Sequence, residues 1–181
     1  MTEQIHPPEA VRRFTTEYIA TEDRLRISLE REDESLLVLW LTRRLSMRMV
    51  KHIVKVVNAL PRLKGQTQTA PSDNAQRRNQ LDALGKIEQQ APVLAGPLPE
   101  GLETYLIVEI GLRLTRSGVL LDLKNSNDHV VQTLPFNENA LRQWLGVLHL
   151  NFTKAQWQED IWPLWITSKG WDQGPDALRL N

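Results

Sequence analysis

The run of residues 35–72 most constrains the fold, because it holds seven Lys or Arg residues and no Asp or Glu. Within it, apolar residues recur at helical spacing and Pro61 follows the last of them. The Thr42 hydroxyl is placed to accept a hydrogen bond from a free amide of the first turn. The pattern predicts one long amphipathic helix over residues 43–60. Its expected buried stripe consists of Leu45, Met49, Ile53, Val56 and Leu60.

Four cations of this helix, Arg44, Arg48, Lys51 and Lys55, recur at helical spacing on one face, and together with Arg43 of the first turn we call them the basic face. Two of these arginines lie in the first turn, where the helix dipole disfavours a cation by roughly 0.3 kcal/mol or more. A neighbouring carboxylate or a ligand would offset that cost. The basic face is therefore the candidate site for an anion or a partner.

Three interpretations of the basic face are open. First, it is a solvated surface balanced by the acidic segment 17–34, which holds seven acids against three arginines. Second, it binds phosphate at the helix N-terminus, through free amides and Arg43 or Arg44. Third, it binds nucleic acid or an acidic protein. The 22 Lys and Arg of the chain equal its 22 Asp and Glu, and the pI is about 6.9. A dedicated nucleic-acid binder usually has a pI above about 9.

Strand patterns precede the helix. Leu25, Ile27 and Leu29 alternate with polar residues, which predicts a strand with one face in water. Residues 36–41 are apolar on both faces, as expected of a central strand. Residues 14–20 form the third predicted strand. Together they predict an antiparallel meander that leads into the helix.

A second block repeats this plan. Asn137 is placed as an N-cap, preceded by two short strand patterns at residues 119–123 and 130–134. One long alternating strand comes before them, and its apolar residues are Leu106, Val108, Ile110, Leu112 and Leu114. The expected fold class is therefore α+β: two antiparallel β-meanders, each followed by a capped α-helix, with the helices packed on the sheet. An internal ββ(β)α duplication is one explanation of the repeat.

The chain is expected to form a single domain over residues 1–181. Its parts are a first meander plus helix (14–60), a connector with one short helix (61–100), a second meander plus helices (101–168) and a loose tail (169–181). In the connector, Ser72 caps a helix in which apolar residues recur every three positions, namely Leu81, Leu84 and Ile87. We expect the connector to lie over the sheet and its polar segment 65–70 to be mobile.

Tryptophan is concentrated near the C-terminus, at Trp157, Trp162, Trp165 and Trp171. Thr153 and Gln156 have the spacing of a capping box, which predicts another helix start there, with Pro163 near its end. These rings either cap the core or serve as interface anchors, because indole combines apolar area with a hydrogen-bond donor. The candidate interface anchors are Trp157, Trp162 and Trp165.

No catalytic motif is visible. The chain has no Cys, and its four histidines, His6, His52, His129 and His149, lack metal-ligand spacing. Nucleophile-elbow, phosphate-loop and dinucleotide-binding glycine patterns are absent. The sequence therefore predicts no cofactor and no metal, and an enzyme is the less favoured class.

The expected function is a non-catalytic protein–protein interaction or assembly protein, either a homodimer or bound to another protein. The alternative is a nucleic-acid or phosphate-binding module that uses the helix at residues 43–60, and the third is an enzyme with an unrecognised site. No apolar run reaches the ~20 residues that span a bilayer, and residues 1–13 lack the apolar region of a secretory signal. A cytoplasmic location without membrane insertion is expected.

Overall fold

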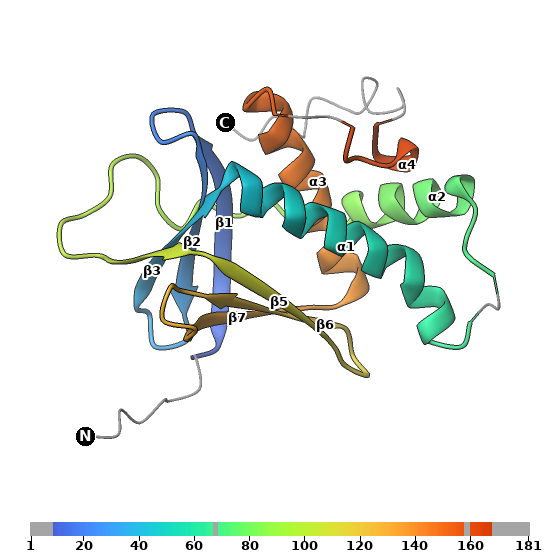
Figure 1. The fold of residues 1–181 in the computed structure, drawn as a ribbon, viewed down its shortest axis with the longest axis horizontal. Coiled ribbons are helices and arrows are strands. Elements are labelled where there is room, and N and C mark those ends of the chain that lie inside the picture. The colour runs from blue at the N-terminus through green and yellow to red at the C-terminus, as the bar shows by residue number, and fades with distance from the viewer. Residues whose placement is uncertain (1–8, 67–68, 158–159, 168–181) are drawn as a thin grey trace.

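The computed structural model describes residues 9–66, 69–157 and 160–167, and its elements form an α+β fold (Figure 1). Two antiparallel meanders are each followed by a capped helix, which confirms the expected fold class. The first meander and its helix are β1 (Val11–Ile19), β2 (Arg24–Arg31), β3 (Leu36–Thr42) and α1 (Arg43–Leu63). The remaining elements are α2 (Asp73–Leu84), β4 (Glu103–Ile107), β5 (Glu109–Leu114), β6 (Val119–Lys124), β7 (Val130–Phe136), α3 (Glu138–Lys154) and α4 (Leu164–Thr167).

The strands form two sheets. Sheet A has the order β1-β2-β3-β4, in which the first three strands are antiparallel and β4 runs parallel to β3. Sheet B has the order β5-β6-β7 and is antiparallel. The chain passes from β3 through α1, α2 and the connector before it returns as β4, so the parallel pair depends on a long crossover.

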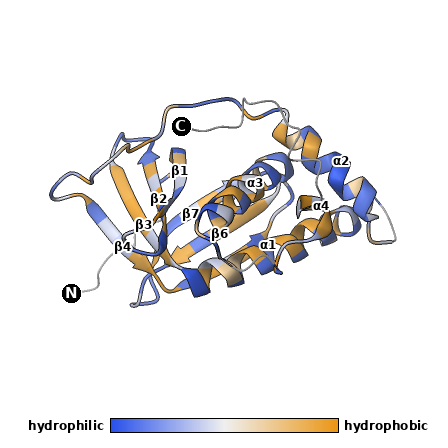
Figure 2. Cartoon of the chain, turned by 90° about the horizontal axis from the view of Figure 1, so that it is seen from above, coloured by the Kyte–Doolittle hydropathy of each residue, from blue (hydrophilic) through white to orange (hydrophobic). Residues whose placement is uncertain are grey.

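One core lies between the sheets and the two long helices (Figure 2). Sheet A contributes the inward residues of β2 and β3, and sheet B contributes Leu121 and Leu123; all of these are fully buried. Leu45, Met49 and Ile53 of α1 belong to the same core, Leu60 is also buried, and Val56 is half-buried. The predicted rotation of α1 is confirmed, because its aliphatic stripe faces the core.

The start of α1 is as predicted, but its end is not. Thr42 Oγ1 accepts a hydrogen bond from the Leu45 amide at 3.3 Å. The helix runs to Leu63, three residues past the predicted end, with Pro61 inside its last turn. Proline there removes one backbone donor, while the Lys64 amide still bonds to the Leu60 carbonyl at 2.9 Å. A proline so close to a helix end is therefore tolerated.

The predicted helix start at Thr153 is wrong. Asn137 caps α3 as predicted, with its Oδ1 2.8 Å from the Ala140 amide. The helix continues to Lys154, and the Thr153 hydroxyl donates to the His149 carbonyl at 3.0 Å instead of capping a new helix. Gln156 then adopts a φ of 53°, which ends the helical path. The short α4 begins directly after Pro163, so this proline precedes a helix and does not end one.

The predicted long strand over residues 106–114 is also wrong, because it breaks at Val108. In β4 the side chain that faces the core is Ile107, whereas in β5 Ile110 and Leu112 pack against the core. The side chains that face the core thus lie at an odd-numbered position in β4 and at even-numbered positions in β5. The Val108 amide donates to the Lys124 carbonyl at 2.9 Å, where the chain passes from sheet A to sheet B.

The connector covers the outer face of sheet A over β1 and β2. The Val93 amide donates to Thr15 Oγ1 at 2.9 Å, and Arg26 donates to the Gly96 carbonyl at 3.2 Å. Arg26 and Ser28 are consequently 4% and 2% exposed, so the expectation that this face of β2 is in water is wrong. The connector supplies the carbonyl partners that a buried guanidinium requires.

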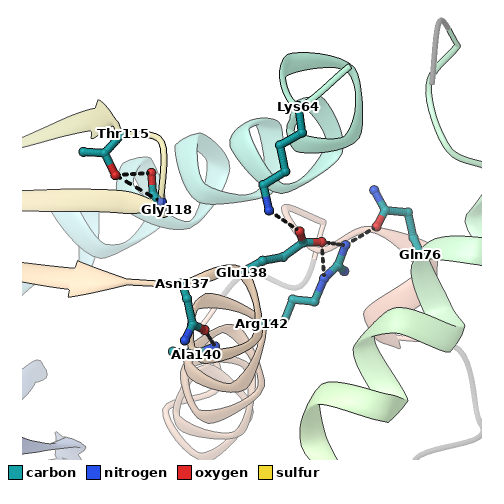
Figure 3. Close-up of polar contacts among 8 residues, drawn as sticks. All are labelled: Lys64, Gln76, Thr115, Gly118, Asn137, Glu138, Ala140 and Arg142. Atoms are coloured by element: carbon teal, nitrogen blue, oxygen red, sulfur yellow. Dashed lines mark hydrogen bonds and ion pairs between the residues drawn. The ribbon is translucent and has the colours of Figure 1, made fainter. Parts of the chain in front are cut away.

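The α2 helix is capped by Ser72 as predicted, but its buried side is largely polar. Leu81 is 45% exposed, while Gln76 and Gln80 are buried. Figure 3 shows Gln76 meeting Arg142, which donates to Gln76 Oε1 at 2.7 Å. The Gln80 side chain donates to the Arg142 carbonyl at 2.8 Å. Polar bonds to α3 thus hold much of the inner face of α2.

Arg142 is 1% exposed and is neutralised by Glu138 at 3.2 Å (Figure 3). Lys64 at the end of α1 binds the other oxygen of Glu138 at 3.0 Å. Burial opposes ionisation of Glu138, but Lys64 and Arg142 outweigh it and hold its pKa below the ordinary value. Burial also lowers the pKa of Arg142. This cluster joins α1, α2 and α3 at one end of the core.

Ile53 provides a direct test of the core, since it is fully buried between the sheets and helices. We expect Ile53→Ala to lower the free energy of unfolding by about 2–5 kcal/mol, because it removes apolar contacts and leaves a cavity. Urea unfolding followed by circular dichroism measures the change. The exposed neighbour Lys55→Ala should alter it by less than about 0.5 kcal/mol. Equal effects of both changes would contradict the rotation of α1.

Candidate functional site

The basic face occupies the outer crest of α1. Because the aliphatic stripe is buried, all five residues of the basic face are exposed. At ~100° per residue, Arg44, Lys51 and Lys55 lie within about 30° of the line opposite the centre of the buried side of α1, whose residues are Leu45, Ser46, Met49, Val50, Ile53, Val57, Leu60 and Pro61. The rise of ~1.5 Å per residue separates the Cα atoms of Arg44 and Lys55 by about 17 Å. The cations therefore form a convex ridge.

No described residue forms an ion pair with the basic face. Two acids of the segment 17–34 bind other arginines: Glu17 binds Arg26 at 2.9 Å, and Glu30 binds Arg13 at 2.6 Å. Asp23 accepts from Trp157 and interacts with Arg43 only through space. Within α1 itself there is no acidic residue. The acidic segment therefore does not neutralise the basic face through direct pairs. His52 is also exposed on this helix.

The predicted tryptophan anchors lie inside the monomer. Trp157, Trp162 and Trp165 are 3%, 6% and 2% exposed and belong to the main core. The Phe152 ring meets the rings of Trp157 and Trp162 edge-on, at centroid distances of 5.0 and 5.3 Å. These three rings present little aromatic surface to a partner. The tail at 169–181 with Trp171, the residues around His6, and residues 67–68 of the predicted mobile segment lie outside the described residues.

A different apolar surface is exposed beside β4, and we call it the β4 patch: Trp40, Leu106 and Val108. Leu106 and Val108 are 43% and 47% exposed, and Trp40 is half-buried. Trp40 and Leu106 are direct neighbours in the register of β3 and β4. None of the three belongs to the hydrophobic core or to the partly buried residues packed against it.

The sequence interpretation missed the β4 patch because it took residues 106–114 as one alternating strand and Trp40 as part of a strand covered on both faces. Three consecutive apolar residues at 106–108 break a strict alternation, and that was the available signal. Trp40 pairs with Arg26 in the register of β2 and β3, so the patch lies on the outer face of sheet A, whereas α1 packs on the inner face. Trp40 lies two residues before the cap of α1.

The described residues hold no group of three or more His, Asp or Glu side chains arranged to bind a metal ion. A shallow hollow beside β1 is lined by Arg12, Arg13, Glu30, Gln90 and Ala91, and Glu30 forms ion pairs with both arginines. In the described part of the chain, no helix combines the length and the apolar character needed to cross a bilayer. Comparisons of the chain with protein-family models, curated proteins and solved structures found no match.

Asp23 ties the turn after β1 to the residues after α3, and it makes stability depend on pH. Trp157 and Tyr18 donate to Asp23 Oδ1 at 2.9 and 3.0 Å. These bonds favour the carboxylate and lower its pKa, so their stabilisation is present above the unfolded pKa and is lost as the pH falls through the folded value.

We therefore expect Asp23→Ala to destabilise the protein at neutral pH, and the difference from wild type to shrink as the pH falls below about 4. Thermal unfolding across a pH series measures this. Glu22→Ala is the matched control, since it removes a carboxylate from the same turn without these bonds. If the difference in melting temperature between wild type and Asp23→Ala stays constant with pH, the stabilising role of the Asp23 carboxylate is wrong.

Lys51 tests whether the basic face opposes folding. It lies next to Arg48 and Lys55 on the helix, and like charges at these spacings cost ~0.2–0.5 kcal/mol each. In Lys51→Glu the side chain would attract Arg48 and Lys55 instead of repelling them. This should raise the free energy of unfolding by about 1 kcal/mol at low salt. Denaturant unfolding at low and high salt checks this, and the gain should diminish in 1 M salt. A destabilised variant would indicate an unrecognised partner for Lys51.

Proposed function

We propose that this protein is a non-catalytic interaction protein that binds an acidic partner protein through the basic face of α1. The observation that carries the proposal is the set of five exposed cations on α1, four of them on one crest, none in an ion pair with a described residue. Crowded like charges cost stability. A face that costs stability and forms no ion pair within the described fold is best explained by a partner of opposite charge.

An acidic protein fits the chain better than nucleic acid does. The chain carries equal numbers of acidic and basic residues, so its attraction for an extended polyanion is local. The tryptophans that would stack on bases, Trp157, Trp162 and Trp165, are buried. A basic ridge of about 17 Å matches an acidic helix or segment of similar length.

A different protein also fits the basic face better than a second copy of the chain. Two basic faces brought together would repel each other, and like-charge contacts disfavour association. A homodimer would need another surface. The expected interaction function is thus retained, with an acidic protein as the partner.

Binding to a defined acidic probe tests this proposal. We expect a fluorescent oligoglutamate peptide to bind the wild type, and Arg44→Glu/Arg48→Glu/Lys51→Glu to weaken it by at least about tenfold, equivalent to about 1.4 kcal/mol. Fluorescence anisotropy gives the dissociation constants, which should rise with salt. Arg78→Glu/Arg116→Glu is the control, because both arginines are exposed outside α1.

Single- and double-stranded oligonucleotides of the same net charge are measured alongside. Tighter binding to an oligonucleotide than to the peptide, lost in the triple variant, would replace the acidic protein by nucleic acid as the partner. Absence of binding to all probes would leave the basic face as a solvated surface and refute the proposal.

A further inference from the structure

β4 is the terminal strand of sheet A. It pairs with β3 on one side, and no described strand pairs with its other side. A terminal strand presents unpaired backbone N–H and C=O groups that form a template for an added strand. Proteins usually block such edges with charged side chains or proline. In β4 the one charged residue is Glu103, already bound to Arg31 at 3.1 Å, and proline is absent.

The side chains beside this edge are apolar and open. Leu106 and Val108 are exposed because the core-facing positions change between β4 and β5. Trp40 lies beside Leu106 on the next strand. The connector is held over β1 and β2 by Thr15 and Arg26, so it covers the other half of this face. The β4 patch therefore combines a free backbone edge with a small apolar surface.

The edge and the basic face adjoin. β4 and α1 both lie along the lower side of the molecule in Figure 2. Trp40 and Arg43 are three residues apart, at most ~11 Å along the extended chain. One partner segment of moderate length can reach both surfaces.

We propose that the acidic partner binds as an extended segment that adds to sheet A beside β4, with apolar side chains on the β4 patch and acidic side chains against the basic face. This inference rests on the proposed function and specifies the partner chemistry: an extended sequence in which apolar and acidic residues both occur. Main-chain hydrogen bonds and apolar contacts supply affinity, and the cations fix register and direction.

Charge complementarity selects such a partner over a second copy of this chain. The acids within residues 103–114 are Glu103 and Glu109, and they already bind Arg31 and Lys124 at 3.1 and 2.9 Å. A second copy paired through β4 would thus bring no free carboxylate from this strand. It would add a second basic face on the same side, where like charges repel.

Two synthetic peptides of equal length and charge test the inference. One alternates Glu with Val and Leu, and the other alternates Glu with Ser and Thr. We expect the wild type to bind the acidic–apolar peptide about tenfold more tightly, because buried apolar anchors dominate such contacts. Leu106→Ser/Val108→Ser should abolish the preference and leave the affinity for the acidic–polar peptide unchanged. Leu150→Ser is the control, because Leu150 is 42% exposed but lies on α3, and this variant should still prefer the acidic–apolar peptide.

Amide hydrogen exchange supplies a second readout that does not depend on affinity. Strand addition should protect amides in residues 103–107 when the acidic–apolar peptide is bound. An unprotected β4, or a preference that survives in Leu106→Ser/Val108→Ser, would overturn the inference.

The outcomes separate this inference from the proposed function. Equal binding of both peptides overturns strand addition and supports the basic face. Binding of neither peptide overturns both. A wild-type dimer in sedimentation that dissociates in Leu106→Ser/Val108→Ser would assign the edge to a second copy and overturn the inference.

Discussion

The burial of the aliphatic stripe of α1 between the two sheets is the constraint on which the surface of this protein depends. Ile53 and Val57 are fully buried, so the helix has one possible rotation and its cations must point outward. α1 also occupies the crossover between β3 and β4, which brings β4 back parallel at the edge of sheet A. One helix thus determines both the ridge of charge and the position of the free edge. A change that disturbed its packing would disturb both surfaces.

Sequence patterns predicted the elements whose determinants are local. The caps Thr42 and Asn137 and the stripe of α1 depend on residues within a few positions of each other, and each is as predicted except that Val56 is only half-buried. The errors arose where distant residues decide. The break at Val108 depends on β6 pairing with β5 and not with β4, and the burial of Arg26 depends on connector carbonyls far away in sequence. In the candidate site, the exposure of the basic face could be predicted from the rotation of the helix. The β4 patch could not be predicted, because it depends on the order of the strands in the sheets.

The cluster around Arg142 shows how a polar helix can be held in a fold with a modest core. Gln76 and Gln80 of α2 are buried, and their bonds run to Arg142 on α3. Removing one partner of such a buried network costs more than the network contributes, because the remaining polar groups lose both water and protein partners. α2 is therefore held in a defined position although its leucine at 81 faces solvent. Sequence periodicity pointed to the leucines because apolar spacing carries no information about buried polar bonds.

The basic face and the β4 patch would contribute differently to binding. Exposed charges act over about 10 Å at moderate salt and raise the rate of encounter, while each contributes little to the lifetime of a complex. Trp40, Leu106 and Val108 act only at contact, but covering them removes apolar area from water and slows dissociation. Salt should therefore change mainly the association rate, and substitutions in the β4 patch mainly the dissociation rate. This separation is expected only if one partner covers both surfaces, since two independent ligands would each show their own rates.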